Sequence, residues 1–143
     1  MNKIAFDILH VDDDEIDQMA VRRALRERGI DCNLINARDG LEALDILNES
    51  YDKPSANPFI ILLDINMPRM DGIEFLDRIH NHSESLIVKN AIVIVLTTSD
   101  AETDLKRAYA HNISGYMLKT DYEGGLSQLM TFLESYDRVT VFP

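Results

Sequence analysis

Five short apolar stretches, rich in β-branched residues, alternate along the chain with longer stretches of helical periodicity. The apolar stretches cover residues 4–11, 32–37, 59–63, 91–96 and 115–118. Residues 60–63 and 92–96 are apolar at every position. Strands buried on both faces show this continuous pattern, whereas half-buried strands alternate between apolar and polar residues. The pattern therefore predicts five strands of a parallel sheet.

The stretches that follow the predicted strands carry apolar residues at intervals of three and four, as the buried faces of helices do. The predicted faces are Ile16, Met19, Ala20 and Ala24; Leu41, Leu44 and Leu47; Ile73, Leu76 and Ile79; Ala101, Leu105, Ala108 and Tyr109; and Leu126, Leu129, Met130 and Leu133. Four predicted helices begin with a capping residue and a glutamate three positions later: Asp39/Glu42, Asp71/Glu74, Ser99/Glu102 and Thr120/Glu123. Repeated strand–helix units place helices on both faces of a parallel sheet, so we predict a doubly wound α/β fold of (βα)5 type.

A chain of 143 residues is long enough for one domain with a proper core. We expect that domain to span residues 1–143, with its core at about 5–137 and a tail at 138–143. Two polar stretches, residues 48–58 and 81–90, are predicted to be loops. Residues 139–142 are apolar, and we interpret them as a loosely packed tail, with an extra strand or a dimer contact as the alternative.

Acidic residues outnumber basic ones by 25 to 14, which gives a formal net charge of −11. This balance disfavours nucleic acid and anionic membranes as partners, because both would repel the chain. No apolar run approaches the roughly 20 residues of a membrane span. Cys32 is the one cysteine, which fits a reducing compartment. We therefore expect a cytoplasmic protein that binds neither nucleic acid nor membrane.

Polar residues follow the ends of four predicted strands. Asp12 and Asp13 follow the first strand, Asp64 the third, Thr97 the fourth and Lys119 the fifth. The carboxyl ends of parallel strands meet at one edge of the sheet, where such folds form their sites. One lysine cannot neutralise three neighbouring carboxylates, and Mg²⁺ prefers oxygen ligands of this kind. The spacing therefore predicts a Mg²⁺ site at this edge.

Asp64 ends an apolar strand and precedes a turn that leads into a capped helix. A carboxylate beside a divalent cation can attack a phosphoryl group, with Thr97 and Lys119 facing the phosphoryl oxygens. The plainer interpretation makes Asp64 a turn or helix-capping residue. We favour the nucleophile, because several strand ends supply complementary groups. His10, which precedes the acidic run, is predicted to be a packed and hydrogen-bonded strand residue rather than a metal ligand.

The chain resembles the receiver domain of two-component response regulators over about residues 5–137. Four segments in this order carry the resemblance: residues 11–13 (VDD), 64–72 (DINMPRMDG), 96–97 (LT) and 115–119 (GYMLK). The resemblance implies a flavodoxin-like fold with strand order 2-1-3-4-5. The long loop before the third strand resembles that of stand-alone regulators paired with phytochrome-like histidine kinases. We therefore expect a single-domain regulator without an output domain, and not an enzyme acting on external substrates.

The resemblance also implies the chemistry of the site. Asp64 would be the phosphoacceptor for a sensor histidine kinase or a phosphotransfer protein. Asp13 and Asp64 would bind Mg²⁺ through their side chains, Asn66 through its backbone carbonyl and Asp12 through water. Lys119 would pair with the phosphoryl group.

The resemblance further implies a switch, in which Thr97 would move toward the phosphoryl group and Tyr116 would change rotamer with it. The surface of the fourth helix, fifth strand and fifth helix would then change and bind a downstream protein target or a second copy of the chain. Asn66, Thr98 and Ser99 would tune the lifetime of the acyl phosphate.

Two positions depart from the family pattern. Thr120 follows Lys119 where the family usually has a cis proline, which leaves open whether the Lys119–Thr120 peptide is cis, and Thr98 is bulkier than the usual residue. The alternatives to a phosphorylated regulator are a phosphorylation-independent pseudo-receiver and a metal-dependent phosphatase. A pseudo-receiver would lack one of the site residues, and none is lost. A phosphatase would want a carboxylate at position 66, where this chain has Asn66.

Four arginines lie on the predicted first helix: Arg22, Arg23, Arg26 and Arg28. They fit a solvated helical face. The receiver resemblance adds docking of a kinase against this helix as the alternative.

Overall fold

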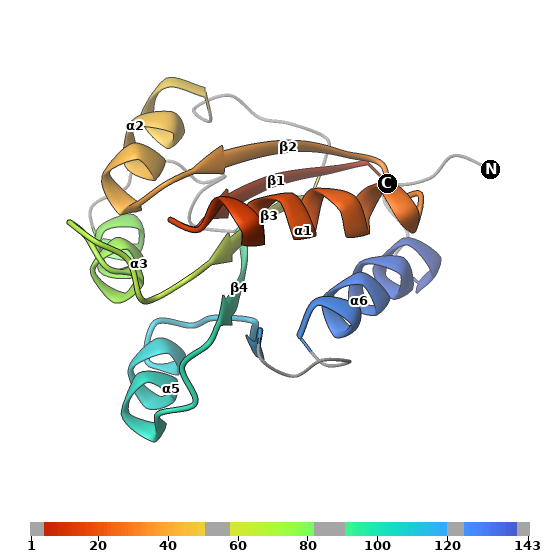
Figure 1. Cartoon of the computed structure of the whole chain (residues 1–143). Coiled ribbons are helices and arrows are strands. Elements are labelled where there is room, and N and C mark those ends of the chain that lie inside the picture. Colours follow the sequence, from red (N-terminus) through yellow and green to blue (C-terminus); the bar gives the residue numbers. More distant parts are fainter. Residues whose placement is uncertain (1–4, 51–57, 82–90, 120–124, 140–143) are drawn as a thin grey trace.

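The computed structural model describes residues 5–50, 58–81, 91–119 and 125–139 of the chain (Figure 1). Five parallel strands form one sheet in the order β2-β1-β3-β4-β5, as predicted. The strands are β1 (Phe6–Val11), β2 (Cys32–Ala37), β3 (Phe59–Leu63), β4 (Ile92–Thr97) and β5 (Gly115–Leu118). β1 begins two residues later than predicted and β4 is shifted by one residue, which makes Thr97 the last residue of its strand.

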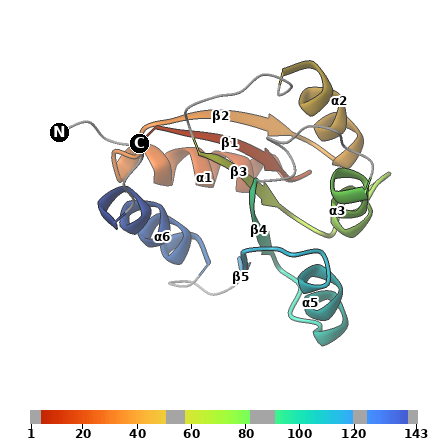
Figure 2. The same cartoon turned by 180° about the vertical axis from the view of Figure 1, so that it is seen from behind.

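Helices cover both faces of the sheet (Figures 1 and 2). They are α1 (Glu15–Glu27), α2 (Gly40–Ser50), α3 (Gly72–Asn81), α5 (Glu102–Tyr109) and α6 (Gly125–Val139). Apolar residues of α1 and α6 pack on one face, and those of α2, α3 and α5 pack on the other. The predicted doubly wound (βα)5 fold is confirmed. In the parts of the chain that the structure describes, no helix is long and apolar enough to cross a membrane.

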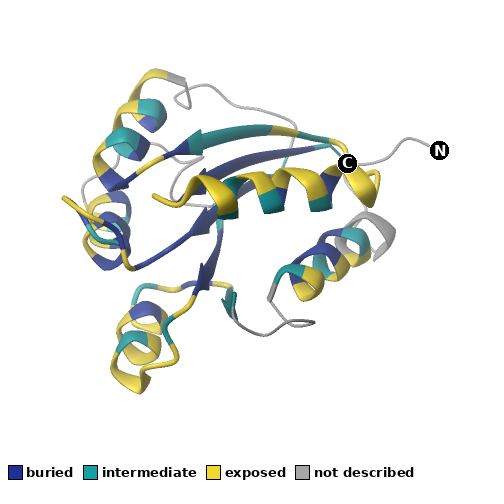
Figure 3. Ribbon diagram, viewed as in Figure 1, coloured by how far each residue is buried: buried dark blue, intermediate teal, exposed yellow. Residues whose placement is uncertain are grey.

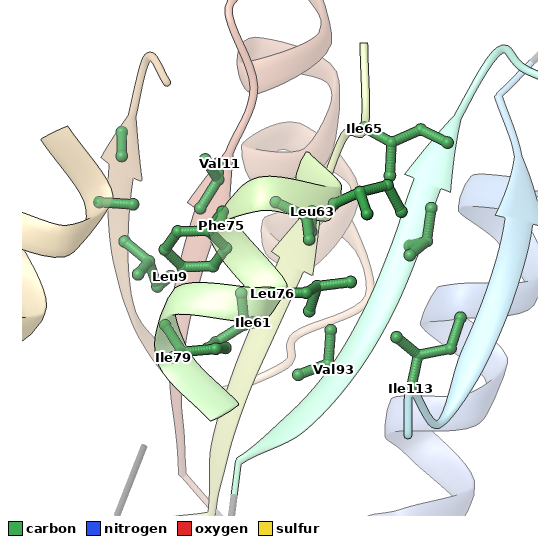
Figure 4. Packing of buried hydrophobic residues seen from close by; sticks show 14 of the residues in the cluster. Leu9, Val11, Ile61, Leu63, Ile65, Phe75, Leu76, Ile79, Val93 and Ile113 are labelled. Atoms are coloured by element: carbon green, nitrogen blue, oxygen red, sulfur yellow. The ribbon is translucent and has the colours of Figure 1, made fainter. Parts of the chain in front are cut away.

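The larger of the two cores lies between the sheet and the α2–α3–α5 layer. Figure 4 shows Phe75, Leu76 and Ile79 of α3 pointing onto the central strands. Phe75 and Leu76 are fully buried, and so are Leu9 and Ile61 beneath them. Burial of large side chains of this kind contributes about 1.5–3 kcal/mol each. This core therefore holds the ends of β1 and β3 firmly beneath the polar residues that follow them.

The predicted buried face of α1 is partly wrong, since Ala20 and Ala24 are half-buried but Ile16 and Met19 are not buried. Ile16 and Met19 are 76% and 57% exposed, and the residues that α1 buries are Val21 and Leu25. Figure 3 shows that most of the α1 ribbon is coloured as exposed. The helix is rotated relative to the prediction, because polar residues in its first turns face inward toward the ends of the strands. Those residues belong to the site described below.

The predicted face of α5 is also largely wrong, since Ala108 is its one buried residue. Leu105 and Tyr109 are 37% and 50% exposed. α5 contacts α3, and the edge strand β5 on its side of the sheet is only half-buried, so the helix buries little surface. In α2, Leu47 is buried as predicted, whereas Leu41 in the first turn is exposed.

Two of the four predicted helix caps are confirmed. Asp39 Oδ1 accepts from the Glu42 amide, and Asp71 Oδ1 accepts from the Glu74 amide, both at 2.9 Å. Ser99 does not cap α5, because its hydroxyl donates to Asp104 at 2.6 Å and the helix begins three residues after it. The helices extend into the segments predicted as loops and tail, because residues 48–50, 81 and 138–139 are helical. The Thr120/Glu123 pair and the rest of those segments, apart from Pro58, lie outside the described residues.

α1 has a cap that sequence reasoning missed. Asp14 Oδ1 accepts from the amides of Ile16 at 2.8 Å and Asp17 at 3.4 Å. We expect Asp14→Ala to lower the free energy of unfolding by about 1 kcal/mol, because two amides of the first turn lose their acceptor. Urea denaturation measures this loss. Asp14→Asn retains an acceptor, so its free energy of unfolding should stay within a few tenths of a kcal/mol of the wild-type value. An equal loss of stability in both variants would show that the charge of Asp14, and not its hydrogen bonds, stabilises the helix.

Candidate functional site

The register of the sheet brings the predicted site residues together. Val11 of β1 pairs with Leu63 of β3, so the residues that follow them, Asp12 and Asp64, lie side by side. The backbone ladder continues one step further, since the Asp64 amide donates to the Val11 carbonyl at 2.9 Å. On the other side of the site, the Lys119 amide donates to the Thr97 carbonyl at 2.8 Å. The strand ends thus fix the backbone from which each side chain projects.

Three carboxylates form a cluster at this edge of the sheet. Asp12, Asp13 and Asp64 each offer one oxygen, and these oxygens lie within 4.8 Å of one another. Two unit charges at that separation repel by about 3.5 kcal/mol at an effective dielectric near 20. Asp12 and Asp64 are buried, whereas Asp13 is exposed and leaves one side of the cluster open. Hard oxygen donors at this spacing, with an open side for water, fit a Mg²⁺ ion.

Lys119 lies among the carboxylates with its side chain 11% exposed. Its Nζ donates to Asp12 Oδ2 at 2.5 Å, Asp17 Oδ2 at 2.8 Å and Asp64 Oδ2 at 3.1 Å. Burial alone would lower the pKa of Lys119, but hydrogen bonds to Asp12 and Asp17 and the charge of Asp64 hold it well above its ordinary value. The lysine is therefore a permanent cation. It offsets one negative charge and leaves the site strongly acidic.

Both oxygens of the Asp64 carboxylate have donors. Oδ1 accepts from the Thr97 hydroxyl at 2.9 Å and from the Asn66 amide at 3.1 Å, while Oδ2 accepts from Lys119. Thr97 is fully buried, so its hydroxyl has a fixed direction. The Asp64 carboxylate is therefore held at both oxygens and is flanked by one hydroxyl and one ammonium. The interpretation of Asp64 as only a turn or capping residue does not account for the contacts with Thr97 and Lys119.

The pKa values of the remaining two acids are shifted in opposite directions. Burial alone would raise the pKa of Asp12, but contacts with His10 and Lys119 and a hydrogen bond from the Asp14 amide bring it below its ordinary value. The pKa of Asp13 is raised by partial burial and by the neighbouring charges of Asp12 and Asp64. Asp12 is thus ionised over the whole physiological range. A cation that binds beside Asp13 would relieve the repulsion that Asp13 experiences.

His10 is packed as predicted, with 1% of its surface exposed. The prediction that it is hydrogen-bonded is wrong, because neither ring nitrogen has a hydrogen-bond partner among the described residues. Nε2 lies 3.6 Å from Asp12 Oδ2, a little beyond hydrogen-bonding distance. The ring is thus held by the packing of its neighbours and not by hydrogen bonds.

Sequence reasoning missed the contribution of α1 to the site. Asp17 contacts Lys119, and Nε2 of the Gln18 side chain donates to the Asp12 carbonyl at 2.6 Å. Both residues lie in the first two turns of α1, on the side that faces the strand ends. Asp17 and Gln18 lie on the same side of the helix as the buried Val21 and Leu25, and two polar residues on a buried side could have indicated a site. The sequence alone does not show which side of the helix faces the sheet, so this could not be recognised.

The predicted switch and tuning residues lie around the end of β4. The Tyr116 hydroxyl donates to the Ser99 carbonyl at 2.7 Å, and the Ser99 amide donates to Thr97 Oγ1 at 3.3 Å. Thr98 is exposed beside them. Thr97 already contacts Asp64, so a continuous series of polar contacts runs from Asp64 to Tyr116. The Lys119–Thr120 peptide extends beyond the described residues.

A cleft of about 490 Å³ opens beside the acid cluster. Asp13 and Asn66 line it on the side of the site, and Met67, Asp104 and Arg107 line it further out. Asp13 is the exposed member of the cluster, so this cleft gives solvent and small molecules access to the carboxylates.

A sequence model of the response regulator receiver domain matches residues 8–130 of the chain. The response regulator Rcp1 of Synechocystis sp. (strain ATCC 27184 / PCC 6803 / Kazusa) is 35% identical over 135 residues, which cover 94% of this chain and 90% of Rcp1. The probable methanogenesis regulatory protein FilR2 of Methanothrix harundinacea is 37% identical over 114 residues, which cover 80% of this chain and 72% of FilR2.

Solved structures of response regulators are also similar to this chain. The crystal structure of the phosphorylated cyanobacterial phytochrome response regulator RcpA has a TM-score of 0.74 at 30% identity and covers 96% of this chain and 97% of RcpA. The Mn²⁺-bound form of Rcp1 has a TM-score of 0.73 at 32% identity and covers 96% of this chain and 99% of Rcp1.

Proposed function

Because the chain belongs to the response regulator receiver domain family, we propose that it is a response regulator that accepts a phosphoryl group on Asp64. Receiver domains take part in two-component signalling, interact with histidine kinases and downstream targets, and bind Mg²⁺ or Mn²⁺ at an acidic site. One observation carries the assignment to this residue. The Asp64 carboxylate contacts the Thr97 hydroxyl and the Lys119 ammonium. It also lies close enough to the carboxylates of Asp12 and Asp13 for the three to bind one metal ion.

The proposed reaction forms an acyl phosphate. A carboxylate oxygen of Asp64 attacks the phosphorus of a phosphohistidine on the kinase or phosphotransfer protein, and the P–N bond breaks. The departing imidazole keeps the electron pair of that bond and takes up a proton. Thr97 and Lys119 then donate to the oxygens of the transferred phosphoryl group instead of to the free carboxylate. Hydrolysis reverses the state, as water attacks the phosphorus and the Asp64 carboxylate leaves.

The acid cluster would hold the divalent cation. Asp13 and Asp64 would bind it through carboxylate oxygens, Asn66 through its backbone carbonyl and Asp12 through water. When bound, Mg²⁺ offsets the negative charge that the phosphoryl group brings to the carboxylates. The buried ammonium of Lys119 cannot do this alone, because it already contacts three carboxylates.

The proposed output is a change in the surface formed by α5, β5 and α6. Tyr116 of β5 is tied to the loop after Thr97 through the Ser99 carbonyl. When Thr97 turns to the phosphoryl group, the contacts of that loop change and Tyr116 can move with them. Tyr109 and Leu105 lie exposed on α5 and supply apolar contact area for a downstream protein or a second copy of the chain. Asn66, Thr98 and Ser99 border the phosphoryl position and would tune its lifetime.

The kinase would dock against the start of α1. Ile16 and Met19 are exposed there, and Asp13 opens the site next to them. Arg22, Arg23 and Arg26 are exposed further along the helix. An apolar patch beside the phosphoacceptor, followed by positive charge, suits an amphipathic helical partner with acidic residues.

The test is phosphorylation of the purified chain by a small acyl phosphate, with and without Mg²⁺, followed by intact-mass spectrometry. We expect wild type to gain one phosphoryl group only when Mg²⁺ is present, and Asp64→Asn to gain none, because the amide is not a nucleophile. Asp45→Asn is the matched control: it makes the same chemical change at an exposed position on α2 and should be modified like wild type.

Two other outcomes would contradict the proposal. A folded wild type that binds Mg²⁺ but stays unmodified would favour a pseudo-receiver. Steady release of phosphate from an added phosphomonoester would favour a metal-dependent phosphatase.

A further inference from the structure

An ion pair joins the loop after Asp64 to the start of α2. Arg69 donates through Nε to Asp39 Oδ2 at 2.7 Å, and its Nη2 contacts the same oxygen. Asp39 is 5% exposed, and its other oxygen, Oδ1, accepts from the Glu42 amide at the start of α2. Asp39 is thus held by the helix it caps, and Arg69 is attached to a fixed anion.

Arg69 has an unusual backbone conformation, with φ at 64°. Residues other than glycine rarely adopt this left-handed region, because the Cβ approaches the neighbouring carbonyl. Such a conformation persists where the surrounding contacts hold it in place. The two donors of Arg69 on Asp39 are contacts of that kind.

A second contact holds the same loop against the same point of α2. The Met70 side chain packs on Gly40, so closely that a Cβ at position 40 would lie 2.9 Å from Met70 Cγ and Sδ. The loop between Asp64 and Gly72 also closes on itself, since the Gly72 amide donates to the Ile65 carbonyl at 3.1 Å. Asn66, whose backbone is tied to the Asp64 carboxylate, lies within this closed loop.

We propose that Asp39 and Arg69 form a positioning pair that fixes the loop at Asn66 and so raises the affinity of the acid cluster for its divalent cation. The inference rests on the proposed function, because it concerns the same metal site. Neither residue would touch the ion. They act by holding the backbone that carries the Asn66 carbonyl, in the way that outer-shell partners orient metal ligands.

Charge alone gives a different expectation for the two residues. A cation at position 69 repels Mg²⁺ and an anion at position 39 attracts it. If only the summed charge mattered, removal of Arg69 would tighten Mg²⁺ binding and removal of the Asp39 charge would weaken it. A positioning pair predicts weaker binding in both cases, since either change releases the loop.

Titration calorimetry with Mg²⁺ on the cation-free chain separates these expectations. Arg69→Ala removes the donor, and Asp39→Asn removes the charge while it keeps an acceptor for the cap of α2. We expect each variant to raise the Kd for Mg²⁺ about three- to tenfold. This is below the roughly ten- to hundredfold effect of partners bonded directly to a metal ligand, because Arg69 acts through the backbone and is 58% exposed. The double variant should bind no more weakly than the weaker single variant, because the two residues act as one unit.

Two further variants serve as controls. Arg38→Ala removes an exposed arginine that pairs with Glu42 in the first turn of α2, and should change the Kd less than twofold. Arg69→Gly accepts the left-handed backbone without strain, so a loss of affinity there does not come from backbone strain. Thermal unfolding without cation checks that each variant is folded.

Tighter binding by Arg69→Ala together with weaker binding by Asp39→Asn would overturn the inference in favour of summed charge. Unchanged binding in both variants would overturn it outright while the metal site stands. No saturable binding by wild type would overturn both the metal site and the positioning pair.

Discussion

Replacement of Lys119 by alanine is expected to destabilise the cation-free protein by about 3 kcal/mol at pH 7, because it leaves buried carboxylates without their cation. Asp12 is fully buried and Asp64 is 7% exposed, so water cannot replace the lost ammonium well. Urea denaturation of wild type and variant in the presence of a chelator measures the difference. The same variant should form little acyl phosphate, since the phosphoryl oxygens lose their ammonium donor.

The pH dependence of this difference follows from two pKa shifts. The raised pKa of Lys119 means that its contribution to stability is complete below the unfolded value of about 10.4 and is lost only above it. The lowered pKa of Asp12 means that its contribution is complete above an unfolded value of about 3.9 and is lost as the pH falls through the folded value. The gap between wild type and variant should therefore be widest between about pH 5 and pH 9 and should narrow in acid.

Mg²⁺ should rescue the alanine variant more than it stabilises wild type. A cation at ten times its Kd stabilises the folded state by about 1.4 kcal/mol. In the variant no ammonium competes for the carboxylates, so Mg²⁺ binds more tightly. Lys106→Ala is the matched control, since Lys106 forms an exposed pair with Glu102 on α5 and should change stability by less than about 1 kcal/mol. Equal losses in the two variants, or equal stabilisation of wild type and Lys119→Ala by Mg²⁺, would show that Lys119 is not the internal cation of the site.

Gly72→Ala is expected to destabilise the protein by about 3 kcal/mol and to impair phosphorylation at the same time. A Cβ at position 72 would lie 2.6 Å from the Asp64 carbonyl oxygen and 2.6 Å from Ile65 Cα. Both atoms belong to the backbone, so no side-chain rotation can relieve the overlap. The first turn of α3 or the end of β3 must move, and a shift of about 1 Å in the phosphoacceptor can cost a hundredfold in rate.

Gly115→Ala provides the control within the same chain. A Cβ there would meet its nearest neighbour, Ile94 Cγ2, at 4.0 Å, which is ordinary contact. We expect this variant to differ from wild type by less than about 0.5 kcal/mol and to be phosphorylated normally. Denaturation curves and intact-mass spectrometry measure both properties on both variants. Loss of stability with an unchanged phosphorylation rate would contradict the second part of this prediction. It would show that Gly72→Ala displaces α3 but leaves Asp64 in place.

The strands were predictable because their environment leaves little choice of residue. β3 and β4 are buried on both faces, so their sequences are apolar up to Asp64, which follows β3, and Thr97, which ends β4. β1 is also buried throughout, but it carries Asp7 and His10 between its apolar residues. The same burial places Asp12, Asp64 and Thr97 at one edge. This explains why the acid cluster and its hydroxyl could be assigned from sequence alone.

α1 was misjudged for the complementary reason. Its inward face carries Asp17 and Gln18 in the first two turns, where they contact Lys119 and the Asp12 carbonyl. A pattern search assumes that inward positions are apolar, so it preferred the face with Ile16 and Met19. Functional residues often break the hydrophobic pattern in this way. The Asp39–Arg69 pair escaped notice because its members are 30 residues apart and nothing in the local sequence connects them.

The three contacts of Lys119 affect how a divalent cation would bind to the site and dissociate from it. Because the Lys119 ammonium already contacts the carboxylates of Asp12, Asp17 and Asp64, we expect the chain to fold without a metal ion. A cation that binds the proposed site would share these carboxylates with an internal ammonium and would not have to neutralise them alone. We therefore expect its affinity to be modest, so that the metal dissociates readily.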